Sequence, residues 1–556
     1  MSRRLLSSLV SAPTLLLVGL LVYLPLSLQI PLIRAEGMYA LIPKEMLAAG
    51  SWLTPHLNGA HYLDKPQLLY WLYLVAYKIL GPSDWVARLV CQCLTLAEIF
   101  LAYLIGRRLF PARPAWLGGF ILLSSVGFFT LHLQILTDHL VTVALAASFY
   151  FLLRWQEDPR FRWAALFHLS LVVGFFSKGF IGLLFPLLIG GLYAWQQRQP
   201  RFSRLFCSPR GLGLLLILVV PWFVGVEQAN PGFLKHQIIN EQIMRFLGQR
   251  QPPDVTPYSL WEFWLFAGIW LLPWTVLLPE ALYRFWQETR PGGSTDSRGR
   301  LLLIWAGVVM GFFTLSASRI EYYSLPALLP LALILGWRVD RFLSETQDRS
   351  FSWALVILAF LGMANLFLVP GMEHLCAANR REFEGMFALI RPFCYQAAFL
   401  VPGLAIFGAV AGRRRPRLAV ASLGALSLVL VYLTFQSLLA LSPALSDKAP
   451  GEFVRAQAGP QDVLVMEYIE EFEYGASFSF YAGRPILMVQ RDGLPQFPFP
   501  VPPEENYLIS PDRLRELWQG PHRVFLLTDH CVPREPFLAR ARVALSLPGK
   551  CLLVNQ

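Results

Sequence analysis

The segment RRRPRLAVASLGALSLVLVYLTFQSLLA, residues 413–440, opens with an arginine cluster, and its residues 418–440 carry no charge. A bilayer has a hydrocarbon core about 30 Å thick, which an α-helix of roughly 20 apolar residues crosses. Residues 418–440 therefore predict a transmembrane helix. Arginines gather on the cytoplasmic side of such helices, so the cluster predicts which end of this helix lies inside.

Apolar runs of similar length recur along the chain and predict about thirteen transmembrane helices. They cover residues 12–33, 84–106, 114–134, 137–153, 163–177, 179–196, 212–230, 259–283, 301–318, 322–337, 352–371, 393–411 and 418–440. Of the 556 residues, 55% are hydrophobic and only 15% are charged. Soluble domains contain about 45–50% apolar and about 25% charged residues, so this composition excludes a soluble protein. The first run lacks the small-residue cleavage site of a signal peptide, which favours an uncleaved helix.

The loops between these runs alternate between arginine-rich and arginine-poor. The arginine-rich loops contain Arg3, Arg4; Arg107, Arg108, Arg113; Arg154, Arg160, Arg162; Arg198, Arg201, Arg204, Arg210; Arg284, Arg290, Arg298, Arg300; Arg338, Arg341, Arg349; and Arg413, Arg414, Arg415, Arg417. The positive-inside rule makes these loops cytoplasmic and places the N-terminus inside. An odd number of helices then places the residues after about 441 outside.

The net charge of +11 is explained by these arginine-rich loops. No basic run is interleaved with exposed aromatic residues, which argues against nucleic-acid binding. The seven cysteines form neither a CxxC pair nor a zinc-type spacing. Cys376 and Cys394 flank one outer loop, and Cys531 and Cys551 share the C-terminal tail. Exported cysteines can form disulfides, and at least the tail pair is predicted to be bonded.

The tail after residue 445 has a different pattern. Short apolar runs at 462–466, 485–489 and 523–528 are typical of buried strands, and residues 450–458 and 511–519 are typical of helices. The sequence therefore predicts two domains. Residues 1–445 form the transmembrane domain with a long first outer loop at 34–83, and residues 446–556 form a small α/β domain outside the membrane.

The outer loops carry the residues suited to chemistry at a membrane surface. Transfer of a group from a lipid phosphate needs a carboxylate to activate the acceptor and cations to hold the phosphate. The first outer loop contains Glu36 and the pair Asp64-Lys65, and its stretches at 39–47 and 68–80 are amphipathic, as in interfacial helices. Asp138 begins the fourth helix on the same side. Lys178 and Arg319 lie in short turns at the membrane boundary, where a charge is costly and often functional.

The segment EGMYALIPKEMLAAGSWLTPHLNG, residues 36–59, and the motif YLDKPQLLYW, residues 62–71, resemble a known family. They are similar to the GT-C class of polyprenyl-phosphate-dependent glycosyltransferases, the bacterial relatives of the protein O-mannosyltransferases. Within that class, the likeness is greatest to the 4-amino-4-deoxy-L-arabinose lipid A transferases. It extends over nearly the whole chain and implies thirteen helices, a long first periplasmic loop and a C-terminal periplasmic domain.

The resemblance implies roles for individual residues. The catalytic carboxylates would be Glu36 and Asp138. The cations on the donor phosphate would be Lys65, Lys178, Arg245 and Arg319. The substrate-binding residues would be Tyr39, Tyr62, Asp64, Glu241, Tyr322 and Tyr323. The chain departs from the family pattern at three positions: Ala35 replaces an aspartate, Met38 replaces an arginine and Gln242 replaces a histidine.

Each of these residues also has a purely structural interpretation. Glu36 and Asp138 can cap helices, Lys65, Lys178 and Arg319 can anchor the chain at the interface, and tyrosines are common in interfacial belts. The lone histidines establish no metal site.

The function implied by the resemblance is an inverting glycosyltransferase at the outer face of a bacterial inner membrane. It would move a sugar from an undecaprenyl-phosphate-linked donor to a lipid, glycan or protein acceptor. No cofactor is certain, and a divalent metal remains open. A transporter or flippase of a lipid-linked sugar is an alternative, although no inverted repeat is visible. A non-catalytic scaffold subunit is another alternative, suggested by Ala35.

Overall fold

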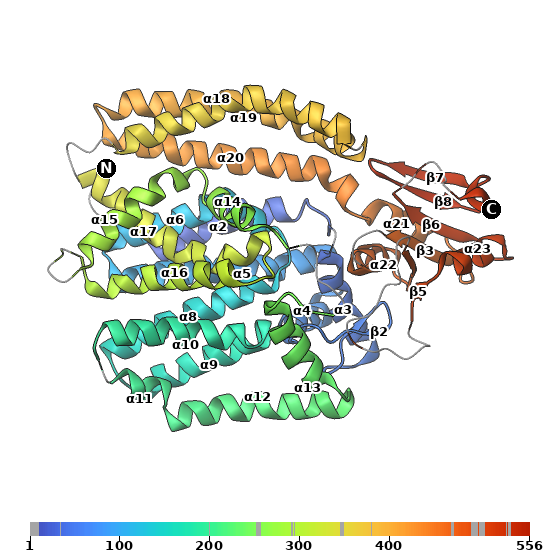
Figure 1. Ribbon diagram of the computed structural model, residues 1–556, viewed down its shortest axis with the longest axis horizontal. Coiled ribbons are helices and arrows are strands. Elements are labelled where there is room, and N and C mark those ends of the chain that lie inside the picture. The colour runs from blue at the N-terminus through green and yellow to red at the C-terminus, as the bar shows by residue number, and fades with distance from the viewer. Residues whose placement is uncertain are drawn as a thin grey trace.

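The computed structural model describes residues 10–33, 35–199, 201–251, 257–290, 293, 295–344, 350–379, 381–468, 472–490, 499, 506–529, 531 and 535–555. The side chains of residues 372–385 lie outside this description. The chain forms a long helical bundle with a small sheet-containing unit at one end (Figure 1). The first described residues and helices α11 (Phe202–Phe206) and α15 (Leu278–Glu288) lie at the opposite end of the bundle.

The bundle contains α2 (Ala12–Ser27), α5 (Asp84–Leu109), α6 (Ala112–Ser124), α7 (Val126–His132), α8 (Thr137–Glu157), α9 (Phe161–Lys178), α10 (Ile181–Gln196), α12 (Pro209–Ala229), α14 (Leu260–Ile269), α15, α16 (Arg300–Leu315), α17 (Leu325–Ser344), α18 (Ser350–Asn379), α19 (Arg381–Gly412) and α20 (Pro416–Leu445). Every apolar run predicted from the sequence coincides with one of these helices or with a bent pair of them. The pairs are α6 with α7, bent by 61°, and α14 with the segment Trp274–Glu288, bent by 102°.

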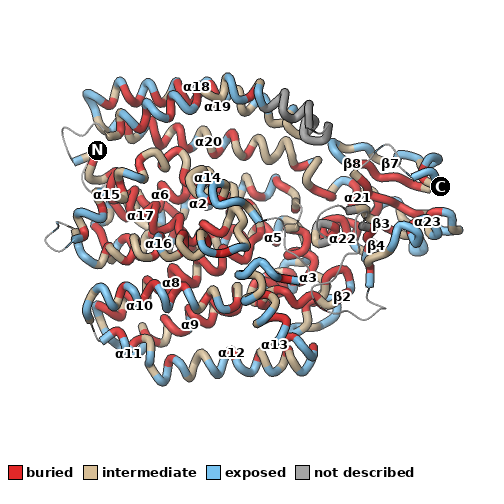
Figure 2. Tube along the Cα trace, viewed as in Figure 1, coloured by how far each residue is buried: buried red, intermediate tan, exposed pale blue. Residues whose placement is uncertain are grey.

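By length and composition alone, seven helices among the described residues can cross a membrane, or up to nine if each bent pair is one span. The count of thirteen therefore stays a prediction. The burial pattern is that of a membrane bundle. Helix α17 is almost wholly buried, whereas α12 and α18 expose large apolar side chains such as Ile217 and Phe360 along their outer faces (Figure 2). Apolar surface of this extent is stable against lipid and not against water.

Two helices and a hairpin form the described part of the first outer loop. Helices α3 (Glu36–Ala49) and α4 (Leu68–Leu80) coincide with the two predicted amphipathic stretches, and α3 ends at Gly50 in the left-handed conformation. Between them, β1 (His56–Leu57) pairs antiparallel with β2 (Ala60–His61). The turn residues Asn58 and Gly59 both have positive φ, as a two-residue hairpin turn of Asn-Gly requires.

The C-terminal tail folds around a six-stranded sheet with the order β5-β4-β3-β6-β8-β7. Strands β3 (Val463–Tyr468), β4 (Leu487–Gln490), β5 (Leu508–Ile509) and β6 (Val524–Thr528) are parallel, and β8 (Lys550–Val554) and β7 (Arg542–Leu547) are antiparallel. The three strands and two helices predicted in the tail are confirmed, the helices being α21 (Lys448–Gln457) and α23 (Pro511–Gln519). The sequence missed β5, β7, β8 and α22 (Ala476–Ala482), which are short or less apolar.

The tail rests on the first outer loop. A Cβ on Gly37 of α3 would lie 2.3 Å from the backbone nitrogen of Ser477 in α22, so the two helices approach as closely as a glycine allows. The side-chain oxygen of Asn58 accepts a hydrogen bond from the Ile486 backbone N–H at 2.9 Å. The Tyr481 hydroxyl accepts one from the Leu32 N–H at 2.8 Å. These contacts hold the α3–α4 region between the bundle and the sheet.

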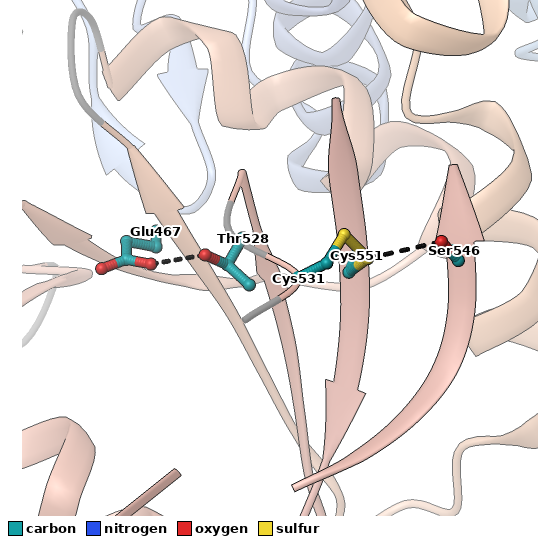
Figure 3. The surroundings of a disulfide bond; sticks show 5 residues. All are labelled: Glu467, Thr528, Cys531, Ser546 and Cys551. Atoms are coloured by element: carbon teal, nitrogen blue, oxygen red, sulfur yellow. Dashed lines mark hydrogen bonds between the residues drawn. A yellow bond between two sulfur atoms is a disulfide. The ribbon is translucent and has the colours of Figure 1, made fainter. Parts of the chain in front are cut away.

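The disulfide predicted in the tail is confirmed. Cys531 and Cys551 are bonded, with Cα atoms 5.2 Å apart, and the bond attaches the segment after β6 to β8 (Figure 3). Cys394 is a free thiol, and the side chain of Cys376 lies outside the described residues.

Candidate functional site

A cavity of about 440 Å³ lies where the first outer loop meets α9, α10 and α16. Its charged lining residues are Asp64, Lys65, Lys178, Glu241 and Arg245. Its apolar lining residues include Ile181, Leu184, Leu247, Phe312 and Phe313. A cavity lined by both cations and many apolar side chains suits a molecule with a charged head and a hydrocarbon tail.

Lys178 connects the cavity to Asp138. Lys178 ends α9 and Asp138 lies in the first turn of α8, so helix packing brings together two residues that are 40 positions apart. The Lys178 ammonium is 2.7 Å from each oxygen of the Asp138 carboxylate, and it lies 4.3 Å from the centre of the Tyr323 ring. Asp138 is buried and reaches the cavity only through this lysine.

A buried ion network surrounds Asp64. The Arg250 guanidinium donates to Asp64 at 2.7 Å and to Glu241 at 2.6 Å, and His236 Nε2 is 3.1 Å from Asp64. Burial raises the pKa of Asp64, but the hydrogen bond from His236 and the charge of Arg250 outweigh burial and lower the pKa to about 2. Asp64 is therefore ionised at neutral pH and fixes this corner of the cavity.

Arg245 follows the π-helical segment η1 (His236–Met244), which also carries Glu241. Its guanidinium is 2.9 Å from the Glu241 carboxylate and only 16% of its side chain is exposed. Lys65 stands next to Asp64 in the wall of the cavity. Rare π-helical turns are common at functional sites, and this one directs an acid and a cation to the same cavity.

The structure gives Arg319 a different position from the other predicted cations. Its guanidinium donates to the carbonyl of Tyr258 at 3.2 Å and to the carbonyls of Thr314 and Ser316. Among the described residues, the cavity is lined by its neighbours Ser316 and Ser318 but not by Arg319. Arg319 thus binds the backbone at the end of α16.

Glu36 also lies outside the cavity lining. Its carboxylate forms a two-point ion pair with Arg88, at 2.6 and 2.8 Å, and accepts the backbone N–H groups of Ile33 at 2.8 Å and Ile135 at 2.9 Å. The exposed fractions of the two side chains are 1% for Arg88 and 6% for Glu36. A carboxylate with both oxygens occupied in this way ties α3, α5 and the loop before α8 together.

The predicted tyrosines divide into two groups. Tyr323 lines the cavity, and the neighbouring Tyr322 ring is 5.9 Å from the Lys178 ammonium. Tyr39 and Tyr62 are buried in the core of the outer loop, where Tyr39 stacks on Tyr70. Burial, and secondarily the charge of Asp138, raises the pKa of the Tyr39 hydroxyl, which is therefore neutral at physiological pH.

Two residues of the site were missed by sequence reasoning. His236 and Arg250 lie in the polar loop at 231–258 and match no spacing that would have singled them out. Their importance comes from contacts with Asp64, which is 172 and 186 positions away in the sequence. The sequence signal available was that this loop is polar and lies on the outer side.

Asp64, His236 and Glu241 present ligand atoms within 4.8 Å of one another and could hold a metal ion. Histidine and carboxylate ligands are those of a zinc-type site. Arg250, however, already donates to both carboxylates, and Arg245 pairs with Glu241, so two guanidinium groups face the two acids without a metal. A second group, Glu98, His132 and His139, lies away from the cavity.

The chain is similar to known proteins in sequence and in fold. Residues 64–224 match the family described as dolichyl-phosphate-mannose-protein mannosyltransferase. The undecaprenyl phosphate-alpha-4-amino-4-deoxy-L-arabinose arabinosyl transferase 1 of Pseudomonas fluorescens (strain Pf-5) is 31% identical over 368 residues, which cover 65% of this chain and 63% of that protein. The corresponding transferase of Aeromonas salmonicida is 30% identical over 358 residues, covering 61% of this chain and 63% of that protein. The chain thus spans less than two thirds of the length of these relatives.

The fold is shared with a solved structure over nearly the full length. ArnT from Cupriavidus metallidurans bound to undecaprenyl phosphate superposes with a TM-score of 0.80 at 21% identity, covering 98% of this chain and 97% of that one. Its apo state gives a TM-score of 0.77. The chain is therefore a polytopic α-helical membrane protein that shares the fold of ArnT, and its sequence is similar to those of bacterial undecaprenyl phosphate-alpha-4-amino-4-deoxy-L-arabinose arabinosyl transferases.

Proposed function

We propose that this protein is an inverting glycosyltransferase that uses an undecaprenyl-phosphate-linked sugar as donor. The observation that carries the proposal is the cavity, because its cations and its apolar wall match the two halves of a polyprenyl phosphate. The names of the relatives and of the solved ArnT complex, which refer to undecaprenyl phosphate, agree with that ligand chemistry. The acceptor is a lipid, glycan or protein hydroxyl, of which lipid A agrees best with the likeness to the arabinose transferases.

In the proposed reaction, the acceptor oxygen attacks the anomeric carbon while the bond from that carbon to the phosphate oxygen breaks. The leaving phosphate gains negative charge, which Lys65, Lys178 and Arg245 stabilise more strongly in the transition state than in the ground state. The segment Asp64-Lys65-Pro66 of the first outer loop lines the cavity and limits the access of water, which would otherwise compete as acceptor.

The acceptor proton needs a carboxylate, for which the sequence offered Glu36 and Asp138. We assign it to Asp138, because Asp138 contacts a residue of the cavity directly whereas Glu36 holds Arg88. A donor phosphate competes with Asp138 for the Lys178 ammonium, so donor binding frees the carboxylate to accept a proton. Arg319 is assigned to hold the loop behind Ser316. The proposed reaction uses no metal step, and the guanidinium groups of Arg245 and Arg250 already pair with the acids that would bind one.

The proposed location is a bacterial inner membrane, with the N-terminus in the cytoplasm and the C-terminal unit outside. The alternation of arginine-rich loops supports this orientation. The disulfide between Cys531 and Cys551 supports it independently, because disulfides persist in oxidising compartments. A reporter that is active only in the cytoplasm, fused after Gln556, should be silent, and activity there would reverse the orientation.

The decisive experiment is transfer in vitro by the purified full chain from a synthetic undecaprenyl-phosphate sugar. Sugar transfer with loss of activity in Lys178→Met supports the proposal. A flippase would move the labelled donor across vesicles without breaking the glycosidic bond, and a scaffold would do neither. Mass analysis of envelope lipids and glycans, with and without the protein, identifies the acceptor.

A further inference from the structure

Helices α5, α7 and α8 bring Glu98, His132 and His139 together inside the membrane bundle. The three side chains are 0 or 1% exposed. Their ligand atoms lie within 4.8 Å of one another, and none of them lines the donor cavity. They stand apart from the residues of the proposed reaction, although His139 is the sequence neighbour of Asp138.

Hydrogen bonds to the backbone fix the protonated nitrogen of each imidazole. His132 Nδ1 is 2.7 Å from the Phe128 carbonyl oxygen. His139 Nε2 is 3.1 Å from the carbonyl of Leu131 and 3.2 Å from that of Gln134. A carbonyl oxygen only accepts hydrogen bonds, so these nitrogens carry the protons. In the neutral rings, His132 Nε2 and His139 Nδ1 are left with lone pairs.

Both lone pairs face the same carboxylate oxygen. Glu98 Oε1 is 2.9 Å from His132 Nε2 and 3.4 Å from His139 Nδ1. One proton can be shared between Glu98 and His132, but it leaves His139 Nδ1 without a hydrogen-bond partner. Glu98 Oε2 lacks one as well. Buried polar atoms without partners are rare in native proteins because each is costly, so a cation that contacts all three residues accounts for the arrangement better than a proton.

We propose that Glu98, His132 and His139 form a site for a divalent transition metal of the zinc class. Two imidazoles and one carboxylate are a known three-ligand set for zinc. Ligand atoms about 2.0–2.1 Å from a tetrahedral ion lie about 3.3–3.4 Å apart, close to the 3.4 Å between His139 and Glu98. Histidines that bind metals nearly always donate their other N–H to a carbonyl or carboxylate, as both histidines do here.

A metal at this position would join three helices beside the first turn of α8, which carries Asp138. The ion would tie the middle of α5 to the end of α7 and the first turn of α8. The site differs from Asp64, His236 and Glu241, where Arg250 already supplies positive charge. Around Glu98, the ion pairs recorded within the described ranges are those with the two histidines.

The test is the metal content of the full chain, purified in detergent from cells grown with added Zn²⁺ or Co²⁺, since a fully buried site loads during folding. The wild-type chain should retain about one ion per molecule, and the Co²⁺ form should show the visible bands of four-coordinate cobalt. Glu98→Gln and His139→Asn should each lower the retained metal at least about tenfold. His168→Asn is the matched control, because His168 is equally buried and its Nδ1 contacts the Ala164 carbonyl at 2.8 Å. It should keep the metal.

Gel filtration and thermal unfolding identify any variant that fails to fold. If a variant fails to fold, the wild-type chain is purified instead from cells grown with and without a chelator in the medium. The unfolding midpoint should be higher for the metal-loaded form. Retention of the metal in folded Glu98→Gln, together with its loss in His236→Asn, would assign the ion to the other group and overturn the proposal. A folded wild-type chain without metal would overturn it too, and would leave a proton shared between Glu98 and His132. None of these readouts depends on sugar transfer.

Discussion

Replacing Glu36 by glutamine tests whether the Glu36 carboxylate has a structural role or a catalytic one. The Glu36 carboxylate accepts two hydrogen bonds from Arg88 and two from backbone N–H groups. Glutamine keeps one accepting oxygen and places an NH₂ group against the donors that faced the other. It also leaves the Arg88 charge buried without a partner, which typically costs about 3–5 kcal/mol. We therefore expect Glu36→Gln to destabilise the protein by about that amount.

The assay measures two quantities for each variant: the midpoint of thermal unfolding in detergent and the rate of sugar transfer per folded molecule. A double-variant cycle with Arg88→Met measures the coupling, and Arg88→Met should cost less in the Glu36→Gln background than in the wild type. The control is Glu516→Gln, which makes the same chemical change in a surface pair with Arg513, where the side chains are 65% and 57% exposed. Surface ion pairs contribute about 0–1 kcal/mol, so the unfolding midpoint of Glu516→Gln should be close to that of the wild type.

The opposite outcome would refute the reasoning. If Glu36 were the general base, Glu36→Gln would unfold at the wild-type temperature while turnover fell by about 10²–10⁴-fold, the usual range for general-base assistance. With Asp138 as the base, the folded fraction of Glu36→Gln should instead keep its rate within about tenfold of the wild type.

Four further predictions follow from the same contacts. Asp138→Asn should lower turnover by about 10²–10⁴-fold while donor binding becomes tighter, because the carboxylate that competes for Lys178 is removed; single-turnover transfer and donor binding measure the two effects. Lys65→Ala should weaken donor binding by a few kcal/mol, roughly 10- to 100-fold or more, and unchanged affinity would remove Lys65 from the phosphate site. Because the pKa of Asp64 is lowered to about 2 from about 3.9 in an unfolded chain, its ion pairs should stabilise the protein fully above about pH 4 and lose that effect as the pH falls through 2. This loss should be absent in Asp64→Asn, as a pH series of unfolding midpoints would reveal. Reduction of Cys531–Cys551, which closes a loop with a sequence separation of 20, should cost about 3 kcal/mol, and free thiols at both positions in the unreduced, denatured protein would contradict the bond.

Patterns that depend on local sequence were predicted well. Each apolar run became a helix or a bent pair because, in a bilayer, the backbone must satisfy its hydrogen bonds within the segment. The strands at the centre of the tail sheet were predictable because parallel strands are buried on both faces and hence apolar throughout. The edge strands β5 and β7 have half-exposed residues and a weaker pattern, and the sequence missed them.

The sequence singled out candidate acids and cations but not what each one contacts. Lys178 and Asp138 could be singled out as charges at a membrane boundary, and their ion pair exists only because α8 and α9 pack side by side. The sequence predicted Glu36 to be an acid of the site, whereas its partner Arg88 in α5 gives it a buried structural pair.

The sequence by itself therefore determined the polytopic helical bundle and singled out the loop at residues 34–83, with its acids and Lys65, as a candidate site, because hydrophobic length and residue type are local properties. Only the tertiary structure decided that Arg250 and His236 complete the site around Asp64, and that Glu98, His132 and His139 converge elsewhere. The physical reason is that burial and ion pairing depend on the packing of segments far apart in the chain, which no local pattern specifies.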